Sequence, residues 1–143
     1  NMAIDEGGSI LHGGSPIKIN SRCSSGWFIE PTVIENVPNK SKINQEEIFG
    51  PVVTLLQFKN EKDAIRIAND TNYGLSATIW SRDKEKLNRV SNQINAGIIW
   101  TNCWLVRDLR TPFGGMKNSG HGREGGQEAI HFFTEPKTIC RNI

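Results

Sequence analysis

The sequence predicts an α/β fold in which buried strands alternate with amphipathic helices. Three apolar runs have the length of strands: "VVTLLQF" at residues 52–58, "ATIWS" at 77–81 and "AGIIWTN" at 96–102. Helical periodicity lies between them, and the links are short. Strands joined through helices run parallel, and near-continuous apolar strands suit a sheet covered on both faces. We therefore expect a parallel βαβαβ arrangement.

Each of the two expected helices begins at a polar capping residue and carries one apolar face. The caps are Asn60 and Asp83, whose side chains can accept a hydrogen bond from the first helical turn. The first helix is expected to run through Thr71. The positions expected to be buried are Ala64, Ile65 and Ala68 in the first helix and Leu87, Val90 and Ile94 in the second.

The residues before this region predict shorter elements. "NMAIDEGG" is typical of a helix tail that stops at Gly7 and Gly8, so we expect more of the natural protein to precede this chain. Residues 9–36 carry short apolar segments broken by Gly and Pro, which predicts strands and turns. Residues 41–48 predict a short helical turn that ends before Pro51.

The pattern changes after Asn102, where a long Gly-rich segment holds aromatic residues and arginines. Such irregular segments in compact domains are usually functional or interfacial. A helix is expected over residues 123–132, followed by a final strand, "TEPKTICRN". Pro136 makes this an edge strand, which can pair with another part of the full protein or with another subunit.

Gly120, Gly122 and Gly125 spell the G-x-G-x-x-G pattern of dinucleotide binding. That fingerprint needs a strand before it, a helix after it and an acidic residue about 20 positions later. Turn-forming residues precede Gly120, and Cys140 stands where the acid is expected. We therefore interpret these glycines as turns leading tightly into a helix, with the two charged residues between the last two glycines exposed or paired.

Composition excludes several classes of function. A net charge of +2 gives no reason to expect a nucleic-acid or membrane partner, and no apolar run approaches the ~20 residues of a membrane span. Cys23, Cys103 and Cys140 form no C-x-x-C pair, which argues against a zinc site and a disulfide framework. Each cysteine is expected to be a small buried apolar residue in a reducing, cytoplasmic compartment.

Several segments, in this order, resemble the C-terminal part of the aldehyde dehydrogenase superfamily: "GWFIEPTVIENV", "EEIFGPVV", "ANDTNYGLSATIWSRD", "GIIWTN", "PFGGMKNSGHGREGG" and "FFTEPKTI". "NCWLVRDLRTPFGG" is most similar to the group that oxidises 2-aminomuconic semialdehyde, with His121 as one departure. The resemblance implies that residues 1–133 are the C-terminal part of the catalytic domain and residues 134–143 a strand of the oligomerisation region.

The resemblance also implies the activity. Members oxidise an aldehyde, bound to a cysteine as a thiohemiacetal, by hydride transfer to NAD, and water then releases the acid. Their nucleophilic cysteine, glutamate base, oxyanion asparagine and nucleotide-binding domain lie upstream of the matched segment. No catalytic residue is therefore expected in this chain, Cys103 included, and the isolated chain should be inactive. The full-length protein should be a homodimer or homotetramer acting on a small-molecule aldehyde, as in tryptophan degradation.

Three residues match family positions that contact the cofactor. Glu47 matches a family residue whose carboxylate accepts hydrogen bonds from the ribose hydroxyls on the nicotinamide side. An ionised carboxylate suits this task. Phe49 matches a residue packed beside that ribose and the nicotinamide, and Leu75 one that borders the nicotinamide. The alternatives are a solvated carboxylate for Glu47 and core packing for the other two.

Arg107 matches a position that lines the aldehyde tunnel and is apolar or aromatic in much of the superfamily. A guanidinium in this apolar loop offers a two-pronged fork to a substrate carboxylate. Trp104 and Phe113 would then form walls of the tunnel, and Arg110 is a weaker candidate for the same role. The alternative pairs Arg107 with Asp108 or another local acid.

Two other functions remain open at this point. A retinal or broad-specificity aldehyde dehydrogenase would favour an all-apolar tunnel, against which Arg107 argues. A non-catalytic α/β module that acts by association would need no nucleophile.

Overall fold

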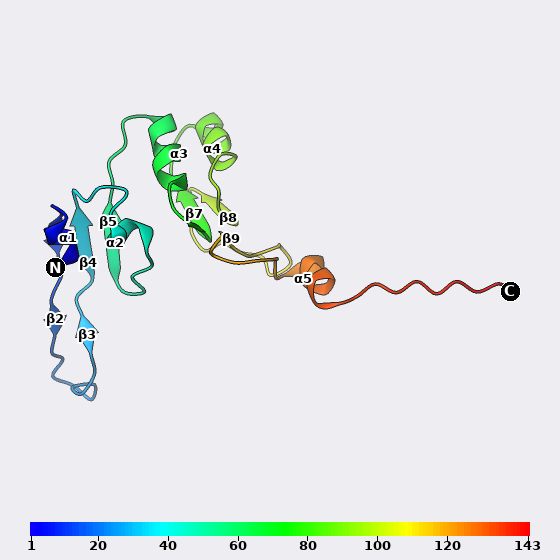
Figure 1. Cartoon of the computed structure of the whole chain (residues 1–143), viewed down its shortest axis with the longest axis horizontal. Coiled ribbons are helices and arrows are strands. Elements are labelled where there is room, and N and C mark those ends of the chain that lie inside the picture. The colour runs from blue at the N-terminus through cyan, green and yellow to red at the C-terminus, as the bar shows by residue number, and fades with distance from the viewer. The chain divides into compact units, whose positions relative to one another are not determined.

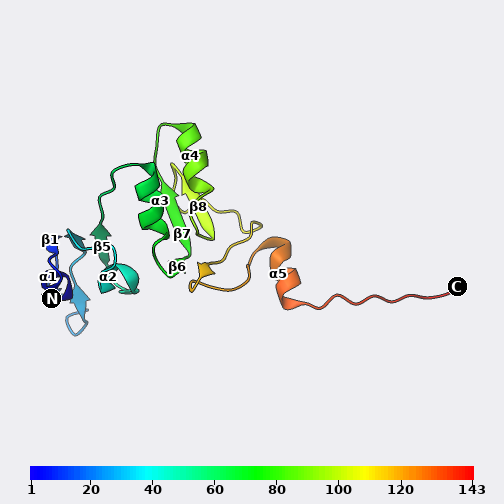
Figure 2. The same cartoon turned by 45° about the horizontal axis from the view of Figure 1, so that its top comes forward.

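The computed structural model describes residues 1–143, which divide into two compact units, Asn1–Asp70 and Thr71–Ile143. The elements of each unit are drawn in Figures 1 and 2. The first unit contains α1 (Met2–Asp5), β1 (Ser9–His12), β2 (Pro16–Ile17), β3 (Phe28–Ile29), β4 (Thr32–Glu35), α2 (Lys42–Gln45), β5 (Val52–Leu55) and α3 (Glu61–Asn69). The second contains β6 (Tyr73–Gly74), β7 (Ser76–Ile79), α4 (Lys84–Ser91), β8 (Ile98–Thr101), β9 (Met116–Lys117) and α5 (Gly126–Phe133).

A three-stranded sheet in the order β1-β4-β5 organises the first unit. β4 and β5 are parallel, and β1 is antiparallel to β4 with a register irregularity between Ile10 and His12. One face of this sheet carries Ile34, which is buried with Ala3 and Val37. β2 and β3 form a separate antiparallel pair. The strands and turns predicted for residues 9–36 are confirmed.

Both short helices of the first unit lie where the sequence predicts them. α1 ends at Asp5, and the chain turns at Gly7, whose φ is +88° and whose N–H donates to the carbonyl of Ile4 at 2.9 Å. α2 begins at Ser41, whose hydroxyl oxygen accepts from the N–H of Ile43 at 3.3 Å. The predicted turn at residues 41–48 is therefore confirmed, but it is helical only through Gln45.

The caps of both longer helices are confirmed. The Asn60 side chain accepts from the N–H of Asp63 at 3.1 Å, and Asp83 accepts from the N–H of Lys86 at 3.0 Å. α3 ends at Asn69 rather than at Thr71. Ala64, Ile65, Val90 and Ile94 are half-buried, Leu87 is buried and Ala68 is exposed. Burial of Ala68 was a wrong expectation, because no strand of the first unit packs extensively against α3.

The parallel pairing is confirmed, but the order of pairing differs from a single βαβαβ sheet. β7, α4 and β8 form a parallel βαβ unit, with Ser76 paired to Ile98 and Ile79 to Thr101. Within the first unit, β5 is hydrogen-bonded to β4. Apolar periodicity marks a segment as a strand, but it does not say which neighbouring edge that strand joins.

The C-terminal elements differ from the prediction at both ends of α5. The helix begins at Gly126 rather than at Arg123, because Gly125 and Gly126 have φ of +88° and +53° and turn the chain first. Residues 134–143 form no strand. A strand needs a second edge for its backbone hydrogen bonds, and no other part of this chain supplies one.

The glycine pattern at Gly120, Gly122 and Gly125 lies in a turn that leads into α5, as predicted. It follows β9, an exposed two-residue strand that pairs antiparallel with β6. Phe113 and Glu124 hold the turn in place by exchanging backbone hydrogen bonds of 2.7 and 2.8 Å. No helix of the structure is both long and apolar enough to cross a membrane.

Candidate active site

Glu47 and Phe49 lie on the loop between α2 and β5 and line one cavity of about 350 Å³. The loop leaves α2 at Glu46 in an extended conformation and reaches β5 through Gly50. Phe49 is 91% exposed and has a φ of +52°. Core packing of Phe49 is therefore excluded in this structure. A positive φ is strained for an aromatic residue, and such strain gathers at ligand-binding sites.

The residues of this cavity have the chemistry that a ribose needs. Glu47 is exposed and its carboxylate forms no hydrogen bond or ion pair, so both oxygens are available to hydroxyl donors. The ring of Phe49, on the same wall, offers an apolar surface to a sugar or a flat heterocycle. The cavity suits one part of a dinucleotide, with the remaining contacts left to other groups.

A second cavity, of about 310 Å³, lies in the second unit between the glycine-rich turn and the end of α5. Leu75 and Phe113 both line it, together with Glu124, Phe132 and Phe133. Leu75 is partly exposed and Phe113 is half-buried. The sequence predicts a cofactor contact for Leu75 and a substrate contact for Phe113, but both residues border this one cavity. The aromatic wall makes this cavity suitable for an apolar or planar group.

Arg107 contacts two of the residues that line this second cavity. Its Nη2 donates to Oε1 of Glu124 at 2.9 Å, and its guanidinium carbon lies 4.1 Å from the centre of the Phe113 ring. The Arg107 side chain is only 29% exposed. The local acid left open by the sequence is therefore Glu124 and not Asp108. A guanidinium stacked on an aromatic ring can still bind a carboxylate through charge-assisted hydrogen bonds.

Arg110 is committed to a different partner. Its Nε donates to both carboxylate oxygens of Asp108, at 2.9 and 3.1 Å. This hydrogen bonding lowers the pKa of Asp108 and raises that of Arg110. Because Arg110 is exposed and already paired, it is a weaker candidate for substrate binding than Arg107.

Trp104 does not line either cavity and is 68% exposed. The structure therefore does not bring it together with Arg107 and Phe113. The neighbouring Leu105 has a φ of +57°, and the indole of Trp100 donates to the carbonyl of Val106 at 2.7 Å. These features fix the start of the loop close to β8.

Residues 1–139 match the family model described as "Aldehyde dehydrogenase family". The chain belongs to the aldehyde dehydrogenase family. It is 48% identical over 140 residues to the 2-aminomuconic semialdehyde dehydrogenase of Danio rerio, covering 96% of this chain and 29% of that protein. It is 42% identical over 138 residues to the 2-hydroxymuconic semialdehyde dehydrogenase of Pseudomonas sp. (strain CF600), covering 96% and 28%.

Solved structures of aldehyde dehydrogenases have the same fold as this chain. An indole-3-acetaldehyde dehydrogenase of P. syringae, solved with NAD+ and IAA, superposes with a TM-score of 0.87 at 38% identity over 94% of this chain and 26% of its own. HpcC from Thermus thermophilus superposes with a TM-score of 0.88 at 40% identity over 99% and 30%. The chain thus spans less than a third of the aldehyde dehydrogenases it matches.

The cysteines of this aldehyde dehydrogenase segment differ from the sequence-based expectation. All three are free thiols; Cys23 and Cys140 are exposed and Cys103 is half-buried. The expected burial is therefore wrong for Cys23 and Cys140. Cys140 lies in the unpaired segment after α5, where nothing covers it, and Cys23 lies in the turn that joins β2 to β3. No group of three or more His, Cys, Asp or Glu side chains is placed to hold a metal ion.

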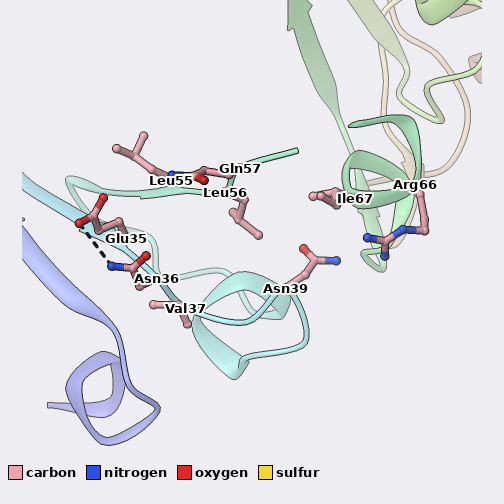
Figure 3. Close-up of a pocket in the computed structure, with 9 residues that line it drawn as sticks. All are labelled: Glu35, Asn36, Val37, Asn39, Leu55, Leu56, Gln57, Arg66 and Ile67. Carbon is pink, nitrogen blue, oxygen red and sulfur yellow. Dashed lines mark hydrogen bonds between the residues drawn. The ribbon is translucent and has the colours of Figure 1, made fainter. Parts of the chain in front are cut away.

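A third cavity, of about 420 Å³, lies in the first unit and was not anticipated (Figure 3). The loop after β4, the loop after β5 and α3 line it. Leu56 and Ile67 lie on opposite sides of the space, and Asn36 donates to the Glu35 carboxylate at 3.3 Å at one end. The Glu35, Asn36 and Arg66 side chains do not converge on one point, so the cavity defines no catalytic centre.

Sequence reasoning missed the role of Gln45 and the partner of Glu124. Glu124 lies within the glycine pattern and was expected to be exposed or paired, but its partner was not identified. Gln45 precedes the "EEIFGP" motif of aldehyde dehydrogenases, but its partner lies 25 residues away, at Asp70. No local pattern marks either contact.

Proposed function

We propose that this chain is the C-terminal part of the catalytic domain of an NAD-dependent aldehyde dehydrogenase that oxidises a carboxylated semialdehyde of the 2-aminomuconate type. The observation that carries the proposal is the guanidinium of Arg107, stacked on Phe113 beside an aromatic-lined cavity. Relatives that are 42–48% identical are named for muconic semialdehydes, which carry a carboxylate.

Arg107 acts as the group that selects the substrate. A carboxylate at one end of the semialdehyde accepts hydrogen bonds from the guanidinium, while Phe113 and the other aromatic residues contact its carbon chain. Glu124 is more exposed than Arg107, at 63%, and moves towards solvent when the substrate takes its place. An uncharged aldehyde has no carboxylate to bind the guanidinium, so the enzyme selects the charged semialdehyde over an uncharged one.

Glu47, Phe49 and Leu75 hold the cofactor. NAD supplies the acceptor for the hydride that leaves the aldehyde carbon. The Glu47 carboxylate accepts hydrogen bonds from the ribose hydroxyls, and Phe49 packs beside the sugar. Leu75 excludes water from the nicotinamide side. These residues orient the cofactor; the cysteine that carries the thiohemiacetal and the glutamate that activates water belong to another part of the whole protein.

The remaining assignments concern the whole protein. Residues 1–133 belong to its catalytic domain, and residues 134–143 become a strand when a partner edge is present. The whole enzyme is then a cytoplasmic homodimer or homotetramer. Trp104 forms part of the tunnel wall once the rest of the catalytic domain packs against the exposed loop.

The test compares the intact enzyme with the isolated chain, following NADH absorbance. The intact enzyme should reduce NAD with a muconate-type semialdehyde and prefer it to an uncharged aldehyde of equal length. The isolated chain should reduce none. Equal rates with both aldehydes would favour a broad-specificity aldehyde dehydrogenase, and an intact protein that reduces no NAD would favour a non-catalytic association module.

A further inference from the structure

α2 consists of four residues, Lys42–Gln45, and carries the start of the loop that holds Glu47. A single helical turn is unstable by itself, because it fixes several backbone dihedrals for few hydrogen bonds. Contacts with other elements must therefore hold α2 and the loop that leaves it. The position of Glu47, two residues after the helix ends, depends on those contacts.

Gln45 makes the contacts that hold the C-terminal end of α2. Its Nε2 donates to the backbone carbonyl of Asp70 at 2.7 Å and to that of Asn39 at 2.7 Å. The first carbonyl lies at the C-terminal end of α3, and the second lies just before α2. One amide group thus joins the end of α2 to two other segments. Gln45 is half-buried, which shields these bonds from water.

The Asp70 side chain reinforces the same junction. Its carboxylate accepts from Nδ2 of Asn39 at 2.8 Å and from the ammonium group of Lys40. The hydrogen bond from Lys40 lowers the pKa of Asp70, so the carboxylate is ionised at neutral pH. At the other end of α2, the Ser41 hydroxyl donates to the Glu6 carboxylate. Both ends of α2 are therefore anchored, and the loop of Glu47 starts from the end that Gln45 holds.

We infer that Gln45 is a positioning residue for the cofactor: by joining the end of α2 to the end of α3, it places the Glu47 carboxylate where the ribose hydroxyls bind. This inference rests on the proposed role of Glu47. A carboxylate that fixes a diol must be placed to within a fraction of an ångström, and loss of its support weakens binding without removing the carboxylate itself. Gln45 touches no ligand and acts through the loop.

The experiment measures the dissociation constant of NAD for the intact enzyme, together with KM for the aldehyde. Gln45→Met keeps the length of the side chain but removes both donors, and should weaken NAD binding about ten-fold, as two neutral hydrogen bonds allow. KM for the aldehyde should stay within about two-fold of the wild-type value, because the proposed function assigns aldehyde binding to Arg107 and Phe113 and not to this loop. Gln45→Lys restores a donor and should recover most of the NAD affinity.

Asn44→Ala is the matched control. Asn44 lies on the same helix, but its amide donates only to the nearby carbonyl of Pro38, at 2.9 Å, and not to α3. The Asn44→Ala variant should keep an NAD affinity within about two-fold of the wild-type value. Equal losses in Asn44→Ala and Gln45→Met would overturn the inference, because a general weakening of α2 would explain both. Failure of Gln45→Lys to restore binding would also overturn it.

Glu47→Gln separates this inference from the proposed function. If Glu47→Gln weakens NAD binding and Gln45→Met does not, Gln45 has no positioning role and the proposed function stands. If neither change affects NAD binding while the intact enzyme still reduces NAD, both the role of Glu47 and the inference are wrong. Circular dichroism and the thermal midpoint of each variant show whether it is folded.

Discussion

Arg107 and Glu124 form an ion pair, with Nη2 of the arginine 2.9 Å from Oε1 of the glutamate. The guanidinium also lies over the ring of Phe113, at 4.1 Å from its centre. In the proposed function, Glu124 occupies the place in which a substrate carboxylate would bind. Because exposed ion pairs contribute little free energy, this internal partner can be displaced by a carboxylate that brings further contacts with it.

Arg107→Ala should lower kcat/KM of the intact enzyme for a carboxylated semialdehyde by roughly 10- to 100-fold, because a hydrogen-bonded charge is lost. The value for an uncharged aldehyde should hardly change. Arg110→Ala is the matched control, since Arg110 is 88% exposed and paired with Asp108; it should change neither value by more than about two-fold. Equal losses for both aldehydes in Arg107→Ala would show a structural role for Arg107.

Glu47→Gln should raise KM for NAD by roughly 10-fold or more, because the neutral amide replaces one of the two acceptor oxygens with a donor. Glu46→Gln offers a neighbouring control. Glu46 is exposed on the same loop and its carboxylate lies 3.6 Å from the Lys42 ammonium. Initial-rate kinetics at saturating aldehyde would measure KM for NAD in the Glu47→Gln and Glu46→Gln variants. Similar effects in both variants would point to the charge of the loop rather than to a specific contact.

Gly125 and Gly7 share a φ of +88° but differ in their surroundings. A Cβ on Gly125 would overlap the carbonyl oxygen of Thr111, whereas a Cβ on Gly7 would meet no atom within 4 Å. Gly7→Ala should therefore cost only the backbone strain, about 1 kcal/mol of unfolding free energy. Gly125→Ala should cost roughly 2–5 kcal/mol, because strain and overlap add. Urea denaturation of the two variants would measure the difference.

Asn60→Ala should lower the unfolding free energy by about 1 kcal/mol, because the N–H of Asp63 loses its acceptor at the start of α3. Asn60→Ser retains an oxygen that can accept the same hydrogen bond and should lose much less. Lys62→Ala, an exposed change in the same helical turn, should be nearly neutral. A loss in Lys62→Ala as large as in Asn60→Ala would mean that the cap contributes nothing specific.

Asp83 should make α4 sensitive to acid. The N–H of Lys86, and then that of Glu85, hold the pKa of Asp83 below its usual value of 3.8. A lowered pKa in the folded state stabilises the protein above pH 3.8, and this contribution is lost as the pH falls through the folded-state pKa. Asp83→Asn keeps an acceptor but does not titrate. The difference in unfolding free energy between wild type and Asp83→Asn should thus be constant above about pH 5 and shrink below about pH 4.

Local features of the fold were predictable because neighbouring residues determine them. The capping roles of Asn60 and Asp83 follow from side chains that reach backbone N–H groups within three residues. The glycine-rich turn before α5 was likewise predicted, since G-x-G-x-x-G without a preceding buried strand does not fit a nucleotide loop. The motifs that mark the family are equally local, and the match over residues 1–139 confirmed them.

Contacts between distant residues were not predictable in the same way. Sequence reasoning left the acid partner of Arg107 open, and the structure shows Glu124, 17 residues later. Core packing was the alternative role for Phe49, which is almost fully exposed in this structure. Nothing in the sequence paired β5 with β4, because apolar periodicity does not identify the edge that a strand joins.

The sequence by itself determined the family, the helix caps, the strand segments and the residue types available to bind a carboxylate and a ribose. Only the tertiary structure decided that Arg107 stacks on Phe113 and pairs with Glu124, and that Gln45 joins α2 to α3. The physical reason is range. Capping and periodicity depend on residues within one or two turns, whereas a hydrogen bond between distant segments depends on the path of the whole chain between them.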